Sequence, residues 1–263
     1  MQKINRGGPV YYQFDQWSGT SAIRHAVFTR HGGASRAPWA SLNLGGTVGD
    51  DPACVQHNIQ LACDALDLDS AKACTVWQVH RADVVVVRQP VPRRRWQARA
   101  DGMVTDVPDL PLLMRFADCV PVLFYDPKKQ VIGIAHAGWR GTAAQVVVNT
   151  VRVMQSAYGS DPADIQAAIG PSIGPDHYQV GPEVVEAVEQ SFGSTEGLVS
   201  RAEDGSAYLD LWAANRLALE RAGVKQIEVA GLCTVEHVAD FFSHRGEHGK
   251  TGRFGATIAL RGA

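Results

Sequence analysis

The alternation of apolar and polar positions along the chain predicts a set of short strands, most of them in its middle. Each candidate is an apolar run of strand length bounded by polar or turn-forming residues. We expect strands at residues 23–29, 75–79, 84–87, 112–117, 120–125 and 131–135.

Helices are predicted where an apolar stripe of helical period follows an N-terminal signal. Asp51 and Pro52 precede a first stripe, and Pro182 opens a second. Asp210 can cap a third, which stops at Gly223. The stripes are Val55, Ile59, Ala62 and Leu66; Val184, Val185 and Val188; and Leu211, Ala214 and Leu217. Clustered strands followed by interspersed helices indicate an α/β protein of α+β-like character, not a regular βαβ alternation.

Length and composition are consistent with one domain over residues 1–263. The 263 residues are 45% hydrophobic, and no repeat or linker interrupts them. The 25 Lys and Arg nearly balance the 27 Asp and Glu, so a nucleic-acid partner is not expected. No apolar run resembles a signal peptide or a membrane span, which predicts a cytoplasmic protein without a membrane partner. Whether it is a monomer or a homodimer stays open.

The cysteines and an arginine-rich segment complete this first picture. Five cysteines are widely spread and form no CxxC pair, so we expect free thiols. Residues 91–99 include three consecutive arginines after a proline. We interpret this segment as an exposed loop, with a phosphate-binding patch as the alternative.

Residues 131–142 combine a buried strand, a turn of small residues and the start of an Ala/Val-rich helix. His136 is therefore predicted at the end of the strand. Thr142 can cap the following helix, whose first N–H groups favour an anion. Arg140 lies in the turn, where a guanidinium can bind an oxyanion through two hydrogen bonds. The alternative is an ordinary turn with a solvent-facing arginine.

Two further residues that can bind a metal follow apolar runs. Cys119 lies in a bend between two of them, and His80 follows the segment at 75–79. Alone, such a cysteine is usually a small buried side chain, and such a histidine is usually structural. Together with His136 they offer two imidazoles and a thiolate, which suit Zn²⁺ and leave a fourth position for water or substrate.

Motifs along nearly the whole chain resemble one family. They are FTRHGGAS from Phe28, SLNLG, VGDDP, QVH, ADCVPVLFYDP, HAGWRGT, GPSIGP, DLWAANRLAL, CT at Cys233 and FFSHRGEHGKTGR. The chain thus resembles the YfiH-type proteins, variously called multicopper polyphenol oxidases, laccase-domain proteins and purine nucleoside phosphorylases. Two positions depart from the family pattern: Arg81 replaces the glycine that usually follows QVH, and His248 lies within the C-terminal motif.

The resemblance implies that His80, Cys119 and His136 bind zinc, with Cu²⁺ as the alternative ion. It also implies layered mixed β-sheets flanked by helices. The implied reaction is phosphorolysis of adenosine, inosine and related nucleosides, with adenosine deamination as a second activity. Purine nucleoside and phosphate are then the small-molecule partners.

Roles for further residues are hypotheses within that reaction. Arg140, helped by the N–H groups after it and by Arg30, would orient phosphate against the anomeric carbon. Asp118, Gln78 and Asn43 are alternative donors of a proton or hydrogen bond to the departing purine.

Three other functions compete with phosphorolysis. Cys119 and His136 could act as nucleophile and base of a hydrolase of amides or cell-wall peptides. A multicopper oxidase needs paired H-x-H units, and none occurs among the nine histidines. A zinc that only stabilises an interaction module predicts a fourth protein ligand, and no obvious one adjoins the three. The H-x-x-E-H pattern at His244 is not a zinc-protease helix, because Gly246 and Gly249 disfavour a helix there.

Overall fold

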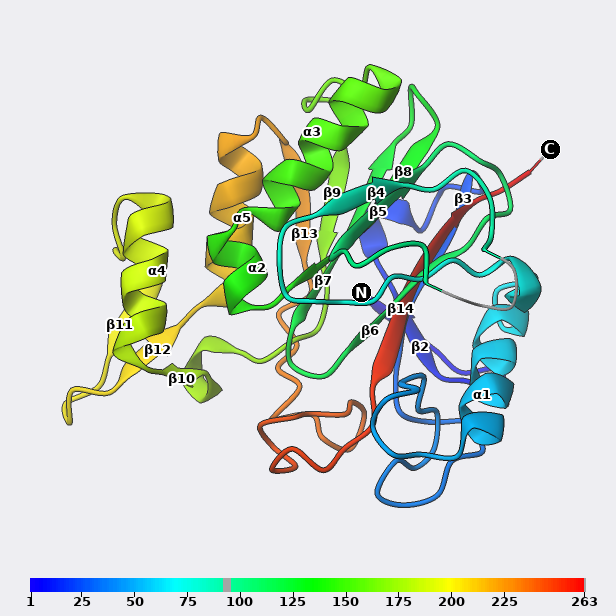
Figure 1. The fold of residues 1–263 in the computed structure, drawn as a ribbon, viewed down its shortest axis with the longest axis horizontal. Helices are drawn as coiled ribbons and strands as arrows, with labels where there is room; N and C mark the ends of the chain where they lie inside the picture. Colours follow the sequence, from blue (N-terminus) through cyan, green and yellow to red (C-terminus); the bar gives the residue numbers. More distant parts are fainter. Residues whose placement is uncertain (92–95, 263) are drawn as a thin grey trace.

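The computed structural model describes residues 1–91 and 96–262, and Figure 1 shows its strands crossing the middle of the molecule. One sheet has five strands and is antiparallel throughout. Its order is β1 (Gln2–Ile4), β2 (Tyr11–Gln13), β3 (Ile23–Phe28), β14 (Phe254–Leu260) and β6 (Leu112–Phe116). The C-terminal strand therefore lies between two strands from distant parts of the chain.

The second sheet has six strands and is mixed. Its order is β13 (Gln226–Val229), β9 (Gln166–Ile169), β7 (Val120–Asp126), β8 (Val131–Ala137), β5 (Gly102–Thr105) and β4 (Val84–Val86). The central strands are antiparallel, and each edge pair is parallel. In the β7–β8 hairpin, Val120 pairs with Ala137, which brings the start of β7 beside the end of β8.

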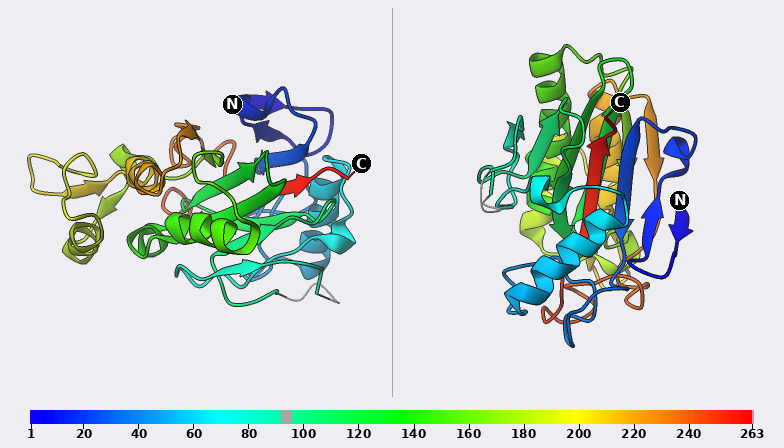
Figure 2. Two further views of the ribbon diagram at one scale, coloured as in Figure 1. Left: turned by 90° about the horizontal axis from the view of Figure 1, so that it is seen from above. Right: turned by 90° about the vertical axis from the view of Figure 1, so that its right-hand side faces the viewer.

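Helices cover the outer faces of the two sheets, and the sheets pack on each other (Figure 2). Helix α1 (Pro52–Asp64) packs on the five-stranded sheet. Helices α2 (Trp139–Ala143), α3 (Val146–Tyr158) and α5 (Leu211–Arg221) lie over the six-stranded sheet. A core that includes Met114, Leu123 and Ile258 fills the space between the sheets. The layered mixed fold flanked by helices is therefore confirmed.

A smaller sheet lies at one end of the molecule, beside α4 (Pro182–Phe192). Its order is β10 (Gln179–Val180), β12 (Ala207–Leu209) and β11 (Val199–Arg201). Three short 3-10 helices, η1 (Asp15–Trp17), η2 (Ser70–Lys72) and η4 (Pro175–His177), occur in connections.

Most predicted elements are confirmed, and three local predictions are wrong. Arg140 does not lie in a turn, because helix α2 already begins at Trp139 and includes it. Residues 75–79 form no strand, because Trp77 makes only an isolated bridge with Arg99 and the Val79 N–H donates to the Asp101 side chain and not to a neighbouring strand. Thr142 does not cap a helix. It lies inside α2, which begins after Gly138, and its hydroxyl accepts a bond from Asn215 at 3.0 Å.

The remaining predictions concern exposure and membranes. The arginine-rich segment predicted as a loop falls largely on residues 92–95, which lie outside the described part of the chain. Within the described ranges, no helix is long and apolar enough to cross a bilayer.

Candidate metal centre and pocket

The bend at residues 117–119 carries the chain from one sheet to the other. Strand β6 belongs to the five-stranded sheet and β7 to the six-stranded one. Asp118 occupies the left-handed region with φ of 81°, which permits a sharp reversal. A Cβ added at Gly138 would lie only 2.8 Å from the Cys119 sulfur. The first glycine of HAGWRGT, Gly138, is therefore required by the close approach of Cys119.

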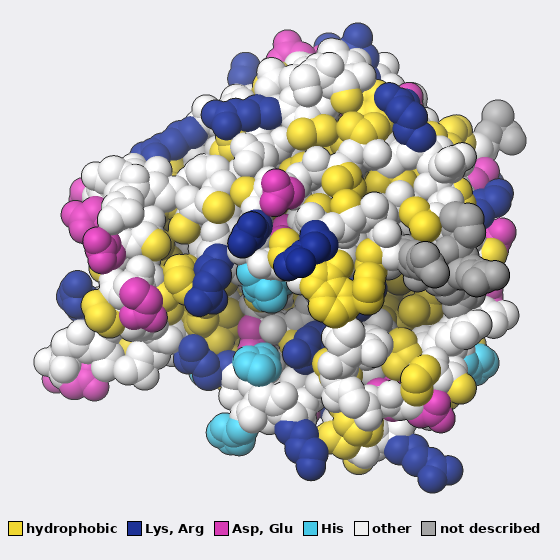
Figure 3. Space-filling view, viewed as in Figure 1, with side chains coloured by type: hydrophobic (Ala, Val, Ile, Leu, Met, Phe, Trp, Pro, Cys, Tyr) yellow, Lys and Arg dark blue, Asp and Glu magenta, His cyan; other side chains and the backbone are white. Residues whose placement is uncertain are grey.

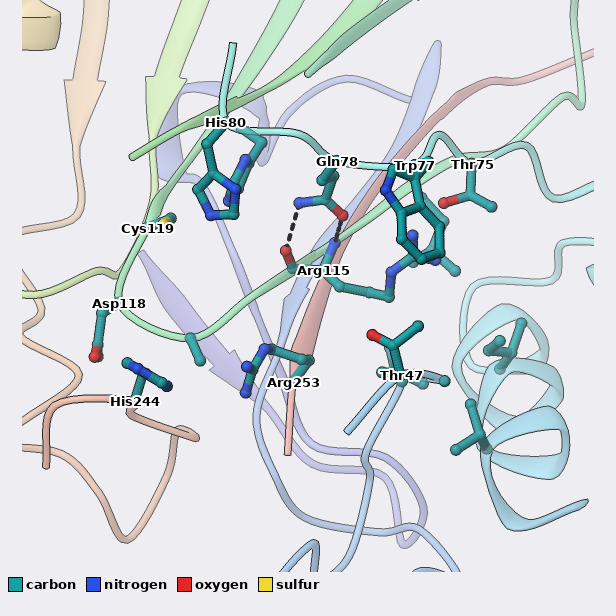
Figure 4. A pocket seen from close by; sticks show the side chains of 18 of the residues that line it. Thr47, Thr75, Trp77, Gln78, His80, Arg115, Asp118, Cys119, His244 and Arg253 are labelled. Carbon is teal, nitrogen blue, oxygen red and sulfur yellow. Dashed lines mark hydrogen bonds between the residues drawn. The ribbon is translucent and has the colours of Figure 1, made fainter. Parts of the chain in front are cut away.

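His80, Cys119 and His136 come together at this junction, as Figure 4 shows for His80 and Cys119. One potential ligand atom from each residue lies within 4.8 Å of the others. The two imidazole rings meet edge to face, with centroids 4.8 Å apart. His136 is buried, Cys119 is half-buried and His80 is exposed, so the cluster opens to one side.

Asp101 holds both histidines in place, and sequence reasoning did not identify it. Its buried carboxylate lies 2.8 Å from His136 Nδ1. The same carboxylate accepts the backbone N–H groups of Val79, His80 and Arg81 at 2.8 to 3.1 Å. His80, with φ of 58°, is thus fixed by backbone bonds, and the other nitrogen of His136 is left free to bind a metal. The only sequence signal was an aspartate directly before the β5 strand.

Electrostatics in the metal-free cluster favour a negatively charged Cys119 beside a positively charged His136. Burial lowers the pKa of His136, but Cys119 and Asp101 outweigh it and raise that pKa to about 9, so a metal ion that binds here displaces a proton from the ring. Burial by itself raises the pKa of the Cys119 thiol, but the neighbouring His136 and His80 outweigh it and bring that pKa well below its usual range. Burial opposes the charged form of Asp101 as well, yet His136 and the backbone N–H groups lower the pKa of its carboxyl. A thiolate and an orienting carboxylate are therefore present near neutral pH.

The donor set fits a zinc ion. Two imidazoles and a thiolate are preferred zinc ligands, and a carboxylate behind one histidine is the usual outer partner of such a site. Among the described residues no fourth histidine, cysteine or carboxylate joins this group, which leaves a coordination position for water or substrate. Copper also accepts this donor set.

Neutralising Asp101 should weaken metal binding without removing a ligand. We expect Asp101→Asn to lower zinc affinity about 10- to 100-fold, because loss of an outer partner lets the ligand rings reorient. Competition with a chelator of known affinity measures the change. Asp126→Asn is the matched control, since Asp126 is also buried and also accepts backbone N–H groups but lies at the far end of β7. Equal affinity in the wild type and Asp101→Asn would contradict this role.

A cavity of about 690 Å³ opens beside the cluster. Histidines and basic side chains gather around a hollow on this face of the molecule (Figure 3). In Figure 4, His80, Cys119, Asp118 and His244 lie at one end, whereas Trp77, Thr75 and Thr47 lie at the other. The second end also includes Val55, Ile59 and Trp96. The rings of Trp77 and Trp96 meet edge to face, with their centroids 4.2 Å apart, and form an aromatic wall at this end.

Two arginines that the sequence did not single out line the cavity between these ends. Arg115 donates to the Val76 carbonyl at 2.9 Å, and Arg253 donates to the carbonyls of Thr251 and Gly252. Within the described residues neither forms an ion pair with a carboxylate, unlike Arg30. Burial lowers the pKa of Arg115 to about 10 and also lowers that of Arg253. Two half-buried positive charges therefore line the cavity, and each guanidinium has further N–H groups that can bind a ligand.

Two of the residues expected to contact substrate line the cavity. The Asp118 carboxylate accepts bonds from the Thr234 hydroxyl and the Arg245 N–H, both at 2.6 Å. Gln78 exchanges two hydrogen bonds with the backbone of Arg115, so it fixes strand β6 beside the cavity.

Three other predicted residues are not among those that line the cavity. Asn43 is buried and uses its amide within its own loop and on the Arg253 N–H. Arg30 pairs with Glu247 and stacks on Phe242. Arg140 is exposed, with its guanidinium 4.1 Å from the Trp139 ring centroid. Their substrate contacts stay predictions.

Known proteins resemble the chain over nearly its full length. A family model described as multi-copper polyphenol oxidoreductase laccase matches residues 24–261. A protein of Deinococcus radiodurans called purine nucleoside phosphorylase is 41% identical, covering 91% of this chain and 90% of that protein. Purine nucleoside phosphorylase YlmD of Bacillus subtilis is 36% identical, with coverage of 97% and 96%.

Solved structures have the same fold. YlmD from Geobacillus stearothermophilus superimposes with a TM-score of 0.91 at 36% identity, over 99% of this chain and 98% of that one. Bacillus licheniformis hypothetical protein YfiH superimposes with a TM-score of 0.91 at 34% identity, over 98% of each chain. The resemblance therefore extends from the motifs to the whole tertiary structure.

Proposed function

The chain belongs to the family described as multi-copper polyphenol oxidoreductase laccase, and we propose that within it this protein is a purine nucleoside phosphorylase. It would convert adenosine, inosine and related nucleosides to the free base and ribose 1-phosphate. The names of relatives such as those of D. radiodurans and B. subtilis support this choice. The observation that carries it is that Arg115 and Arg253 line the cavity beside the His/Cys cluster and, within the described residues, form no ion pair with a carboxylate.

His80, Cys119 and His136 would hold a zinc ion, with copper as the alternative. When bound, zinc supplies Lewis acidity and a bound water of lowered pKa, which is the chemistry that a second activity, adenosine deamination, requires. The chain's own contribution is to fix these three side chains through Asp101 and through the close contact of Gly138 with Cys119.

Phosphate would bind at Arg253 and Arg115. A doubly charged phosphate offers several acceptor oxygens, and two half-buried guanidinium groups can donate hydrogen bonds to them. Arg253 lies close enough to Cys119 and Asp118 for their charges to act on its pKa. Phosphate held there would be oriented against the anomeric carbon at the metal end of the cavity, and orientation with charge neutralisation supplies most of such a rate.

The nucleoside would occupy the remaining space. Its purine has a flat apolar surface that suits the wall formed by Trp77 and Trp96. In phosphorolysis a phosphate oxygen bonds to the anomeric carbon while the purine departs with the electrons of the glycosidic bond and takes up a proton. Of the three residues considered for that proton or hydrogen bond, Asp118 and Gln78 line the cavity, which supports assigning the contact with the purine to one of these two.

The test is product formation with and without phosphate. Purified protein is incubated with inosine and adenosine, and products are identified by mass spectrometry. We expect hypoxanthine and adenine with ribose 1-phosphate only when phosphate is present, and inosine formed from adenosine regardless of phosphate. Cys119→Ala, purified in the same way, controls for host phosphorylases. Absence of phosphate-dependent cleavage in the metal-loaded wild type would reject the proposal.

A cysteine hydrolase is the second candidate, because Cys119, His136 and Asp101 are arranged as a nucleophile, a base and an orienting carboxylate. Chelation separates the two functions. A hydrolase should retain full activity on amide substrates after metal removal, whereas the zinc enzyme should lose its activity. Oxidation of a polyphenol by copper-loaded protein would instead support the oxidase that the family description names.

A further inference from the structure

A second group of metal-binding side chains lies outside the cavity. His177 ends the short helix η4, and Cys233 and Glu236 lie in the segment before the C-terminal motif. One potential ligand atom from each lies within 4.8 Å of the others, and none of the three lines the cavity. We propose that His177, Cys233 and Glu236 form a second site for a divalent cation of the zinc class.

The spacing of the three side chains is close to that around a bound zinc. His177 Nδ1 lies 3.8 Å from Cys233 Sγ and 3.5 Å from Glu236 Oε1. Zinc bonds of about 2.3 Å to sulfur and about 2.0 to 2.2 Å to nitrogen and oxygen, at tetrahedral angles, separate these atoms by about 3.6 and 3.4 Å. Shifts of a few tenths of an ångström would therefore suffice to enclose the ion.

The backbone holds the cysteine in position before any ion binds. Cys233 forms an isolated parallel bridge with Ser172, whose N–H donates to Leu232 and whose carbonyl accepts from Thr234. The sulfur itself accepts the N–H of Gly174 at 3.2 Å.

The exposure of the site to solvent and the types of its ligand atoms indicate a cation site and not only a contact between three side chains. Cys233 is buried, but the His177 and Glu236 side chains are 37% and 49% exposed, so an ion can enter from solvent. Imidazole, thiolate and carboxylate are all zinc ligands, and their mixed hardness suits a borderline ion. A site with an exposed carboxylate should bind more weakly than the buried cluster at Cys119.

Occupancy of this site would stiffen one wall of the cavity. Thr234, next to Cys233, donates to Asp118 at 2.6 Å, and Arg245 donates to the His177 carbonyl at 3.3 Å. Both Asp118 and Arg245 line the cavity. The second ion would therefore have a structural role, and its binding does not depend on the proposed reaction.

The test isolates the second thiolate by removing the first. Metal-free Cys119→Ala is titrated with Co²⁺, and the thiolate-to-cobalt charge-transfer band is followed. We expect the band to saturate at about one equivalent, because Cys233 is the remaining thiolate with an adjacent imidazole and carboxylate. Cys119→Ala/Cys233→Ala should lose the band. The matched control is Cys119→Ala/Cys74→Ala, which should keep the band. It removes a thiol that is as buried as Cys233 and that also accepts an N–H, from Gln97 at 3.3 Å.

A conservative variant guards against loss of folding. Glu236→Gln changes only an exposed side chain and should weaken Co²⁺ binding by about tenfold or more. The proposal is overturned by absence of the band in Cys119→Ala, by its survival in Cys119→Ala/Cys233→Ala, or by unchanged affinity in Glu236→Gln. Zinc titration of the metal-free wild type should give two equivalents, and a single equivalent would also overturn it.

Discussion

Cys119→Ala and His136→Ala are expected to lose the tightly bound zinc and nearly all phosphorolysis. A structural zinc site is worth about 10 to 16 kcal/mol, so one of four ligands contributes about 3 kcal/mol, or about 100-fold in affinity. After dialysis against metal-free buffer, the wild type should retain about one zinc per chain. Without the metal, several kcal/mol of transition-state stabilisation disappear, which corresponds to about 1000-fold or more in kcat/KM.

Elemental analysis and kinetics of the same preparations measure both losses. The matched control is Cys74→Ala, which removes a buried thiol that is not part of the cluster and should leave both quantities unchanged. Wild-type zinc in both dialysed cluster variants would show that the metal assignment is wrong. Zinc bound to the second site does not obscure the result, since that weaker site should empty on dialysis.

Arg253→Gln is expected to cost about 2 to 4 kcal/mol of transition-state stabilisation, or about 30- to 1000-fold in kcat/KM for phosphate. The variant removes the charge but keeps a polar side chain of similar reach beside Gly45 and Thr251. Zinc should stay bound, because no ligand is changed. Deamination of adenosine, which uses no phosphate, should fall much less than inosine cleavage.

Arg140→Gln is the paired variant, because the sequence assigned phosphate to Arg140 whereas the cavity is lined by Arg253 and Arg115. An exposed guanidinium stacked on Trp139 should contribute less than about tenfold. A large loss in Arg140→Gln with none in Arg253→Gln would instead assign the phosphate site to helix α2, which follows β8. Equal losses of phosphorolysis and deamination in Arg253→Gln would mean that Arg253 shapes the whole cavity.

Local sequence signals correctly predicted those helices and strands whose position depends on residues within the element itself. Pro52, Pro182 and Asp210 start α1, α4 and α5, because proline and a capping aspartate act within one turn of the helix. The apolar runs that became β3, β6, β7 and β8 are mostly or fully buried strands, and the run that became β4 is partly exposed; a short apolar run is enough to predict each of them. The strand predicted at 75–79 is wrong because the pairing of Trp77 with Arg99 does not continue along the segment, and the Val79 N–H donates to the Asp101 carboxylate instead.

The sequence by itself determined the three candidate metal ligands and the family, since QVH, ADC and HAGWRGT are local motifs. Only the tertiary structure decided what surrounds them. Asp101 reaches His136 across 35 positions and Thr234 reaches Asp118 across 116, so neither pairing leaves a periodic trace in the chain. The same holds for the placement of Arg253 in the cavity and for the meeting of His177 with Cys233. Such contacts depend on how two sheets pack and where their connecting loops cross, which is decided by the whole core and not by any single segment.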